Sequence, residues 1–195
     1  MIKRCADVTL ALAGIVLLLP LFALTALLIK LDSAGPVMFV HERIGRGFRP
    51  FRMYKFRTMR ADAPLDGSLV TVRGDTRVTR IGRLLRRTKL DELPQLINVL
   101  RGEMSLVGPR PEVRRFVEQF RSDYERLLTV RPGITDPASL KYRDEEAILA
   151  RAACPEDYYV QQVLPDKILL SKKYVQSASF IGDLFILLRT IFRLT

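Results

Sequence analysis

A long uncharged stretch near the N-terminus dominates the hydropathy pattern of the chain. It runs from Val8 to Ile29 and is long enough to cross the hydrocarbon core of a bilayer as a helix. It is too long for the apolar part of a signal peptide, and no small-residue cleavage site follows it. Pro20 lies near its middle, where a proline frees a backbone carbonyl and bends a helix. The pattern predicts a membrane-embedded helix with a break at Pro20.

Positive charge flanks this stretch on both sides. Lys3 and Arg4 precede it, and a much more basic segment follows it. Because positive charge marks the cytoplasmic side of a membrane segment, a straight span would put one basic end on the wrong side. A re-entrant hairpin removes that conflict, because the helix breaks at Pro20 and leaves the membrane by the face it entered. The alternative is a plain transmembrane helix with its basic C-terminal end in the cytoplasm. We expect a membrane segment at 1–33 and a cytosolic domain at 34–195.

Two short stretches beyond the membrane segment predict strands. The first covers residues 37–40, and the second, 51–59, alternates apolar and basic residues as a half-buried strand does. Lys55 and Arg57 share one face of the second strand and are expected to face an anionic group, either a substrate phosphate or lipid headgroups. The polar segment 61–79 predicts a loop.

A short helix that begins with two carboxylates is the most informative pattern. Pro94 suits its first turn, and Gly102 suits its C-terminal end. Asp91 and Glu92 then lie at the helix N-terminus, where free N–H groups and the helix dipole keep a carboxylate ionised and attract phosphate. The apolar residues at three- and four-residue spacing, expected to form one buried face, are Leu93, Leu96, Ile97 and Leu100.

These residues alone leave two interpretations open. Asp91 could be an ordinary helix cap and Glu92 a first-turn acid, with the preceding cations forming a solvated face. Alternatively, an ionised carboxylate beside an anion site is what phosphoryl transfer through a covalent aspartyl intermediate requires.

Two further arginines lie in rigid turns. Pro109 and Pro111 bracket Arg110 and fix its backbone, and Arg131 precedes a proline and a glycine. A guanidinium held in this way binds phosphate well through two parallel hydrogen bonds. An ordinary surface arginine in a proline turn is an equal alternative for Arg110.

The rest of the pattern is mostly helical. The last helix, from Phe180 onward, is apolar but too short and too charged to span a bilayer, so we expect it at the membrane surface or against the N-terminal helix. Asp183 in that helix needs a cationic partner, for which Arg86 is the candidate. The pattern predicts an α/β fold, mostly α, with a small β-sheet and amphipathic interfacial helices. The other expected helices are a basic amphipathic segment at 79–90, then 113–128, 144–153 and 158–170, the last interrupted by Pro165.

Composition narrows the chemistry. The 195 residues include 32 Lys and Arg against 21 Asp and Glu, a formal charge of +11, which indicates an anionic partner. The two cysteines, Cys5 and Cys154, have no Cys or His at metal-ligand spacing, which argues against a zinc site and a disulfide framework. The single histidine, His41, makes a Ser-His-Asp triad improbable, and there is no P-loop or dinucleotide-binding glycine motif.

Taken in order, these motifs resemble the bacterial sugar transferases known as monotopic phosphoglycosyl transferases. Each motif alone is modest, but the ordered set is specific and covers nearly the whole chain. The matching segments are the helix broken at Pro20, Lys55-Phe56-Arg57-Thr58-Met59, Leu90-Asp91-Glu92-Leu93-Pro94-Gln95, 104–111, 131–135 and 174–190.

The resemblance implies a reaction and a set of roles. The enzyme would move a phosphosugar from a UDP-sugar to polyprenyl (undecaprenyl) phosphate, release UMP and initiate assembly of a surface glycan. Asp91 matches the family's nucleophile, and Glu92 completes the acidic pair. Mg²⁺, held partly by Asp91, would neutralise the diphosphate. The basic residues expected around the phosphates are Lys55, Arg57, Arg86, Arg110 and Arg131.

The resemblance also implies where the protein works. Family members of this size consist of the catalytic unit alone, with a re-entrant helix that does not cross the bilayer. We expect a monotopic protein on the cytoplasmic face of the bacterial inner membrane, in contact with anionic lipids and not with nucleic acid. Whether it pairs with itself as a homodimer stays open.

The sequence departs from the family pattern in two places. Leu19 precedes Pro20 where the family often has serine, so the break has one hydroxyl fewer. Many members continue after Thr135 with a Gly-Trp-Ala-Gln type sequence, whereas this chain has Asp136-Pro137-Ala138-Ser139 and no tryptophan. If this loop touches the nucleotide or sugar, donor preference changes.

Two other classes fit part of the pattern. A membrane-tethered nucleic-acid-binding protein would explain the charge and the aromatic–basic interleaving at 48–56. A non-enzymatic scaffold would use its basic face on anionic lipid. Neither accounts for the Asp91–Glu92 pair or the loop around Arg110.

Overall fold

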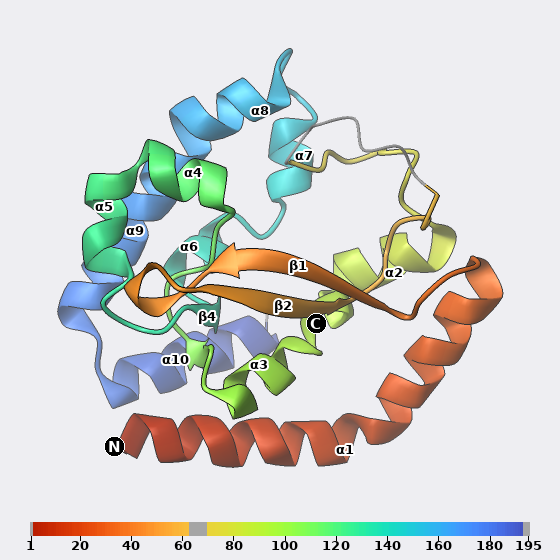
Figure 1. Cartoon of the computed structure of the whole chain (residues 1–195), viewed down its shortest axis with the longest axis horizontal. Coiled ribbons are helices and arrows are strands. Elements are labelled where there is room, and N and C mark those ends of the chain that lie inside the picture. Colours follow the sequence, from red (N-terminus) through yellow and green to blue (C-terminus); the bar gives the residue numbers. More distant parts are fainter. Residues whose placement is uncertain (1, 63–69, 193–195) are drawn as a thin grey trace.

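Helices surround a small β-hairpin in the structure, a computed structural model that describes residues 2–62 and 70–192 (Figure 1). β1 (Met38–Ile44) and β2 (Pro50–Phe56) pair antiparallel, with Met38 opposite Phe56 and Ile44 opposite Pro50. Two three-residue strands, β3 (Ser105–Val107) and β4 (Gly133–Thr135), pair in parallel inside what the sequence predicted as a loop and a turn. The α/β, mostly α class is confirmed, as are both expected strands of the hairpin.

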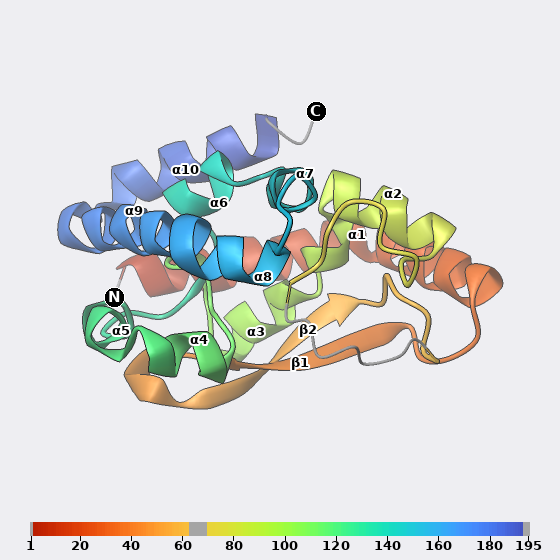
Figure 2. The same cartoon turned by 90° about the horizontal axis from the view of Figure 1, so that it is seen from above.

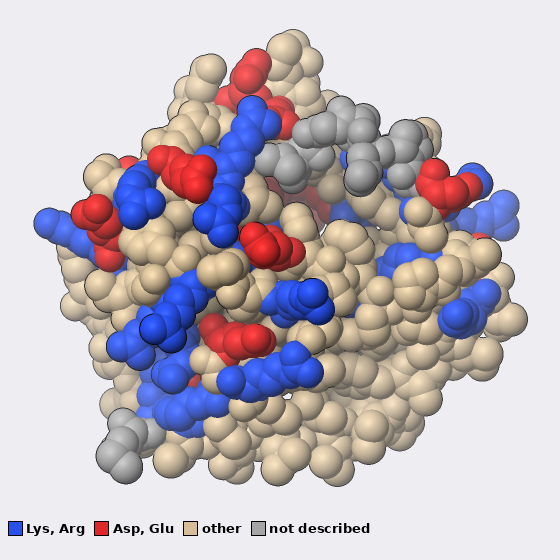
Figure 3. All heavy atoms as spheres, in the orientation of Figure 1, with Lys and Arg blue, Asp and Glu red and all other residues tan. Residues whose placement is uncertain are grey.

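The N-terminal segment is one long helix, α1 (Ile2–Asp32), with Pro20 inside it. Figure 1 shows that α1 bends about half-way along, so the expected break is a bend in a continuous helix and not an interruption. Only four of its 31 residues are buried, and it is long and apolar enough to cross a membrane by length and composition. Uncharged atoms cover the lower edge of the molecule that α1 forms, while basic side chains gather over the neighbouring hairpin face (Figure 3).

Both ends of α1 are fixed to the rest of the protein. Near its start, the buried Asp7 accepts hydrogen bonds from Ser105 Oγ at 2.8 Å and from the Leu106 backbone N–H at 3.1 Å. At its end, Asp32 accepts from the Ile81 N–H at 2.9 Å. The helix therefore lies along the body as part of its framework.

Asp183 has a different partner from the one expected. It pairs with Lys3 at the start of α1 and accepts a hydrogen bond from Tyr174 Oη at 2.7 Å. Arg86 instead pairs with Glu146. The expected pair was wrong because Asp183 joins the last helix to the start of α1, whereas Arg86 contacts the segment around Glu146.

The acidic motif lies between two helices. α2 (Arg80–Thr88) ends at Lys89, whose left-handed backbone (φ 57°) turns the chain into the 3-10 turn Leu90–Glu92. α3 (Gln95–Arg101) then starts from Pro94 and ends at Gly102 (φ 81°), as predicted. Left-handed backbone suits glycine at a helix end.

The buried face of α3 is more polar than the spacing predicts. Leu96 is buried, but Leu93, Ile97 and Leu100 are only partly so, whereas Asn98 is completely buried. Asn98 accepts from the Tyr54 N–H at 3.0 Å and donates to the Arg52 carbonyl at 2.7 Å. Its amide satisfies the backbone of β2 and so joins α3 to the hairpin.

The remaining helices extend from beside the hairpin to the opposite edge of the molecule (Figure 2). The expected helix 113–128 is two helices because the backbone of Phe120 is not helical (φ −114°, ψ 35°). Pro165 causes no interruption, since it lies in the first turn of α9 and a π-helix precedes it. Of the expected loop 61–79, residues 63–69 lie outside the described residues. The elements are α4 (Arg114–Gln119), α5 (Arg121–Leu127), α6 (Pro137–Lys141), α7 (Glu145–Leu149), α8 (Pro155–Tyr158), the π-helix Tyr159–Val163, α9 (Leu164–Ser177) and α10 (Phe180–Phe192).

Candidate active site

Asp91 is buried with one oxygen unpaired. Its side chain sits in the 3-10 turn before α3 and is 6% exposed. Within the described chain, its buried Oδ1 has no hydrogen-bond partner. Burial, reinforced by the neighbouring charge of Glu92, raises the pKa of Asp91, although Lys55 and Arg86 oppose the shift. A buried carboxylate without a partner is costly, so a native structure keeps one where a ligand or a reaction uses it.

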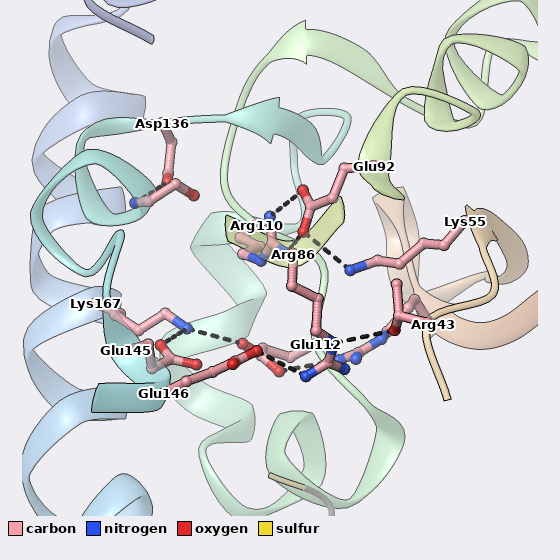
Figure 4. A network of polar contacts seen from close by, with 12 residues as sticks. Arg43, Lys55, Arg86, Glu92, Arg110, Glu112, Asp136, Glu145, Glu146 and Lys167 are labelled. Carbon is pink, nitrogen blue, oxygen red and sulfur yellow. Dashed lines mark hydrogen bonds and ion pairs between the residues drawn. The ribbon is translucent and has the colours of Figure 1, made fainter. Parts of the chain in front are cut away.

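Glu92, the next residue, is held by two cations (Figure 4). Lys55 Nζ, from β2, lies 2.9 Å from Glu92 Oε1, and Arg110 Nη1 lies 3.0 Å from Oε2. The second Arg110 nitrogen, Nη2, donates to Oε1, so the guanidinium donates hydrogen bonds to both carboxylate oxygens. Burial alone would raise the pKa of Glu92, but Arg110 and Lys55 outweigh it and hold that pKa well below its usual range. Glu92 therefore stays ionised as a fixed anchor for two cations.

A cavity of about 480 Å³ brings the expected residues together. Its wall includes five of the seven expected side chains: Asp91, Glu92, Lys55, Arg86 and Arg110. Arg86 donates from Nε to Thr58 Oγ1 at 3.0 Å and from Nη1 to Glu146 at 2.7 Å, which fixes its guanidinium at the rim. The cavity thus combines a buried carboxylate with several cations, the arrangement that binds phosphate groups.

Two expected phosphate-binding residues lie elsewhere. Arg57 donates to the Ser33 carbonyl at 2.8 Å and to that of Ala34, at the end of α1. Because β2 ends at Phe56, the alternation that would place Arg57 beside Lys55 stops one residue too early. Arg131 donates from Nε to the Gly102 carbonyl at 2.7 Å and secures the end of α3. Both arginines fix the backbone and neither lines the cavity.

The sequence did not predict a buried ionic cluster close to Arg110 in the chain. Glu112, two residues after Arg110, accepts from Tyr159 Oη at 2.7 Å and from Arg43 Nη1 at 3.2 Å (Figure 4). Lys167 Nζ, from α9, lies 3.5 Å from Glu112 and 2.9 Å from Glu145. No local pattern connects these residues, because they come from four separate elements.

The charges of this cluster sustain one another. Burial would raise the pKa of Glu112, but Lys167 and Arg43 lower it below the usual value. Burial would lower the pKa of Lys167, but Glu145 and Glu112 raise it. The cluster therefore remains ionised and holds the 109–112 turn, and with it Arg110, in place against Glu92.

Gln95 is a second residue that the sequence analysis did not single out. It lies one helical turn after Asp91 and is 1% exposed, and both polar atoms of its amide are buried without a partner in the described chain. Unpaired buried amides are rare in native proteins and need an explanation. Gln95 and Asp91 together leave three unpaired polar atoms at the start of α3.

The segment that departs from the family pattern lies beside the cavity. Asp136 is completely buried and caps α6 by accepting from the Ser139 N–H at 2.7 Å. It also accepts from Ser171 Oγ at 2.8 Å, which joins α6 to α9. Ser139 itself lines the cavity, so within this segment it is the side chain that is placed to meet a substrate.

The nucleic-acid alternative loses its main support. The aromatic residues of the basic segment are not available for base stacking, because Phe51 and Phe56 are 9% and 4% exposed. Phe48 is covered by the Arg121 guanidinium, whose centre lies 4.7 Å from the ring centroid. Stacking platforms for bases require open aromatic faces.

The cavity joins a buried carboxylate, an anchored second carboxylate and convergent cations, an arrangement suited to phosphate groups. The chain also carries a helix that is long and apolar enough to cross a membrane. The chain belongs to the bacterial sugar transferase family, whose model matches residues 1–195.

The relatives share this region with the chain. The UDP-N-acetylgalactosamine-undecaprenyl-phosphate N-acetylgalactosaminephosphotransferase of Aeromonas hydrophila is 41% identical over 194 residues, covering 97% of this chain and 43% of that protein. The exopolysaccharide production protein PSS of Rhizobium leguminosarum bv. phaseoli is 38% identical over 200 residues, 97% of this chain and 93% of that protein. The UDP-glucose:undecaprenyl-phosphate glucose-1-phosphate transferase of Caulobacter vibrioides is 39% identical over 194 residues, 97% and 68%. The chain thus spans less than half of the first relative and nearly all of the second.

Proposed function

We propose that the chain is a phosphoglycosyl transferase that moves a phosphosugar from a UDP-sugar to polyprenyl phosphate in two steps. In the first, an oxygen of the Asp91 carboxylate attacks the sugar-bearing phosphorus of the donor, the bond from that phosphorus to the bridging oxygen breaks, and UMP leaves. In the second, a phosphate oxygen of the acceptor attacks the same phosphorus, the bond to Asp91 breaks, and polyprenyl diphosphosugar is released. A covalent intermediate divides one difficult displacement into two.

The observation that carries this proposal is the contrast between Asp91 and Glu92. Asp91 is buried and has an oxygen that no described group engages, so it is available to react. Glu92 is engaged by Lys55 and Arg110, so it positions cations and does not compete as a nucleophile. Those cations, with Arg86, face the cavity and would stabilise the negative charge of the transferred phosphoryl group.

Mg²⁺ fits the same place. The described residues form no cluster of three or more His, Cys, Asp or Glu side chains that could hold a metal ion. Mg²⁺ is commonly held by one or two carboxylates together with substrate phosphates, and the unpaired Asp91 Oδ1 is an oxygen of the required type. Asp91 would hold the ion, which when bound neutralises charge on the diphosphate.

The proposed acceptor and membrane location rest on the names of the relatives and on the apolar helix α1. The names of the Aeromonas and Caulobacter relatives specify undecaprenyl phosphate, a lipid, as substrate. The long apolar α1 suits association with the bilayer in which that lipid resides. We place the cavity at the cytoplasmic face of the bacterial inner membrane, where UDP-sugars are available.

Mass spectrometry of the intact protein tests the covalent step. Incubation with Mg²⁺ and a panel of UDP-sugars, without acceptor, is expected to add one phosphosugar to the chain and to release UMP. The adduct should be absent in Asp91→Asn and should fail to form after chelation of Mg²⁺ by EDTA. Asp123→Asn is the matched control, because Asp123 pairs with Lys172, neither residue lines the cavity, and the variant should still form the adduct.

Two results would contradict the proposal. An adduct that persists in Asp91→Asn would move the nucleophile to another residue. The second result has two parts: the folded protein forms no adduct with any donor, and Asp91→Asn transfers phosphosugar to the acceptor as fast as the original chain. Asp91 would then be only a helix cap. The panel also identifies the sugar, since the relatives' names include both N-acetylgalactosamine and glucose.

A further inference from the structure

One wall of the catalytic cavity is apolar, although most of the cavity is lined by charged groups. Leu93 and Leu96 come from the start of α3, directly after the carboxylate pair, and Leu106 and Ile134 come from β3 and β4. α10 continues this wall with Leu187 and Ile191. Apolar side chains on one side of a phosphate-binding cavity indicate a ligand that has both a phosphate and an apolar part.

The wall reaches the outer surface of the protein at one residue. Ile191 lines the cavity and is nevertheless 59% exposed, so it lies at the rim. Leu187 and Thr190, on the same face of α10, lie deeper, and Thr190 is fixed by a 2.8 Å hydrogen bond between its hydroxyl and that of Thr135. The cavity wall therefore passes at Ile191 into the exposed face of α10.

That exposed face of α10 is almost entirely apolar. Figure 2 shows α10 at the edge of the molecule, and its exposed apolar side chains form a surface larger than isolated apolar residues produce. The members of this face besides Ile191 are Phe180, Ile181, Leu184, Phe185, Leu188 and Phe192. A surface of this kind contacts lipid or a lipid-like ligand.

We infer that the isoprene units next to the acceptor's phosphate pass over Ile191 and lie against the wall formed by Leu187 and α3. This inference rests on the proposed function and adds a binding site to it. The phosphate would reach the cations around Asp91, while the chain leaves the cavity over the rim of α10 toward the bilayer. The amphiphilic shape of the acceptor thus matches the change from charged to apolar lining within one cavity.

A matched pair of variants on the same helix tests this site. Ile191→Ser removes the residue at the rim, and Ile181→Ser removes an isoleucine that is 67% exposed and does not line the cavity. Both remove the same apolar side chain from the exposed face of α10, so a general weakening of membrane contact affects both. Neither side chain is buried, so both variants are expected to fold.

The two half-reactions are measured separately in detergent micelles. Adduct formation with the UDP-sugar, followed by intact mass, should be the same in the original chain and in both variants. Transfer from the preformed adduct to undecaprenyl phosphate should fall about fivefold or more in kcat/KM for Ile191→Ser, which is the scale of one lost apolar side-chain contact. It should stay within about twofold for Ile181→Ser, since that contact is not part of the wall.

Three outcomes would overturn the inference. Equal losses in both variants would mean that the α10 face serves only the membrane. A slower adduct formation in Ile191→Ser with unchanged transfer would mean that the rim binds the donor. Unchanged transfer in both variants would mean that the chain leaves the cavity elsewhere. By contrast, absence of an adduct with every donor of the panel, together with transfer that Asp91→Asn leaves unchanged, would refute the proposed function itself.

Discussion

Adjacent residues can carry opposite roles when their surroundings differ. Asp91 is buried and Glu92 is largely covered, but the two cations hydrogen-bond to Glu92 only. The pKa of Asp91 is raised by burial, whereas that of Glu92 is lowered by Arg110 and Lys55 despite burial. Carboxylates whose pKa values diverge in this way commonly divide the work of a site between them.

His41 gives a residue-scale prediction about pH. Burial, with help from Arg43 and Lys55, lowers the pKa of His41 to about 4 from 6.5. Between these two values the unfolded chain binds the proton and the folded protein does not, so the free energy of unfolding should rise as pH increases from 4 to 6.5. His41→Asn should flatten this part of the curve, because His41 is the single histidine of the chain.

Thermal unfolding in detergent micelles, compared at about pH 4.5, inside that window, and about pH 7, above it, measures the effect. The difference in melting temperature between the two conditions should shrink in His41→Asn. A difference that is the same in His41→Asn and in the original chain would show that other groups, such as the buried carboxylates, cause the pH dependence.

The sequence predicts site residues where a local motif fixes their position, and misses those fixed by distant partners. Asp91, Glu92 and Arg110 follow from the start of a helix and a proline turn, and the structure brings them to one cavity. Arg57 was misplaced because β2 ends at Phe56, before the predicted end at 59, so the alternation of the strand does not extend to Arg57. Glu112 was missed because its partners are about fifty residues or more away in sequence.

At the scale of elements, α9 supports the turn that carries Arg110. Lys167 is almost completely buried between Glu112 and Glu145, whereas Lys172, on the same helix, is partly exposed and pairs with Asp123. Removing one partner of a buried ionic cluster leaves an uncompensated charge, which costs far more than loss of a surface pair. No local sequence pattern distinguishes the two lysines, and only tertiary packing separates them.

Lys167→Met should therefore destabilise the protein by about 3–5 kcal/mol, and Lys172→Met by about 1 kcal/mol or less. Denaturant titration in micelles, followed by circular dichroism, measures both. Folded Lys167→Met should also form the adduct more slowly, because the turn that holds Arg110 against Glu92 loses its support. Adding Glu112→Gln to Lys167→Met should recover part of the stability; no recovery would show that Lys167 acts through Glu145 alone.

At the scale of the whole molecule, the contacts of α1 bear on how the protein meets the membrane. A helix of 31 residues is about 46 Å long, more than the roughly 30 Å thickness of the hydrocarbon core. Lys3 and Asp7 contact the body at one end, and Asp32 contacts it at the other, while the helix bends between them (Figure 1). A straight span would separate one of these ends from the body by the width of the bilayer, and its buried contacts would be lost. The contacts at both ends agree with the re-entrant helix expected from the flanking charges, which stays a prediction.

The two native cysteines provide the test, because both are exposed. Cys5 lies near the start of α1, and Cys154 lies in the body just before α8, so Cys154→Ser and Cys5→Ser each leave one reporter. A membrane-impermeant maleimide should label both cysteines in inverted membrane vesicles and neither in right-side-out vesicles. A transmembrane α1 would instead expose Cys5 only in right-side-out vesicles, and the contacts of Lys3 and Asp7 with the body would then have to be absent in the membrane. Labelling of both from the cytoplasmic side would place the cavity, the bend of α1 and the apolar face of α10 on one leaflet, the arrangement that a lipid phosphate acceptor requires.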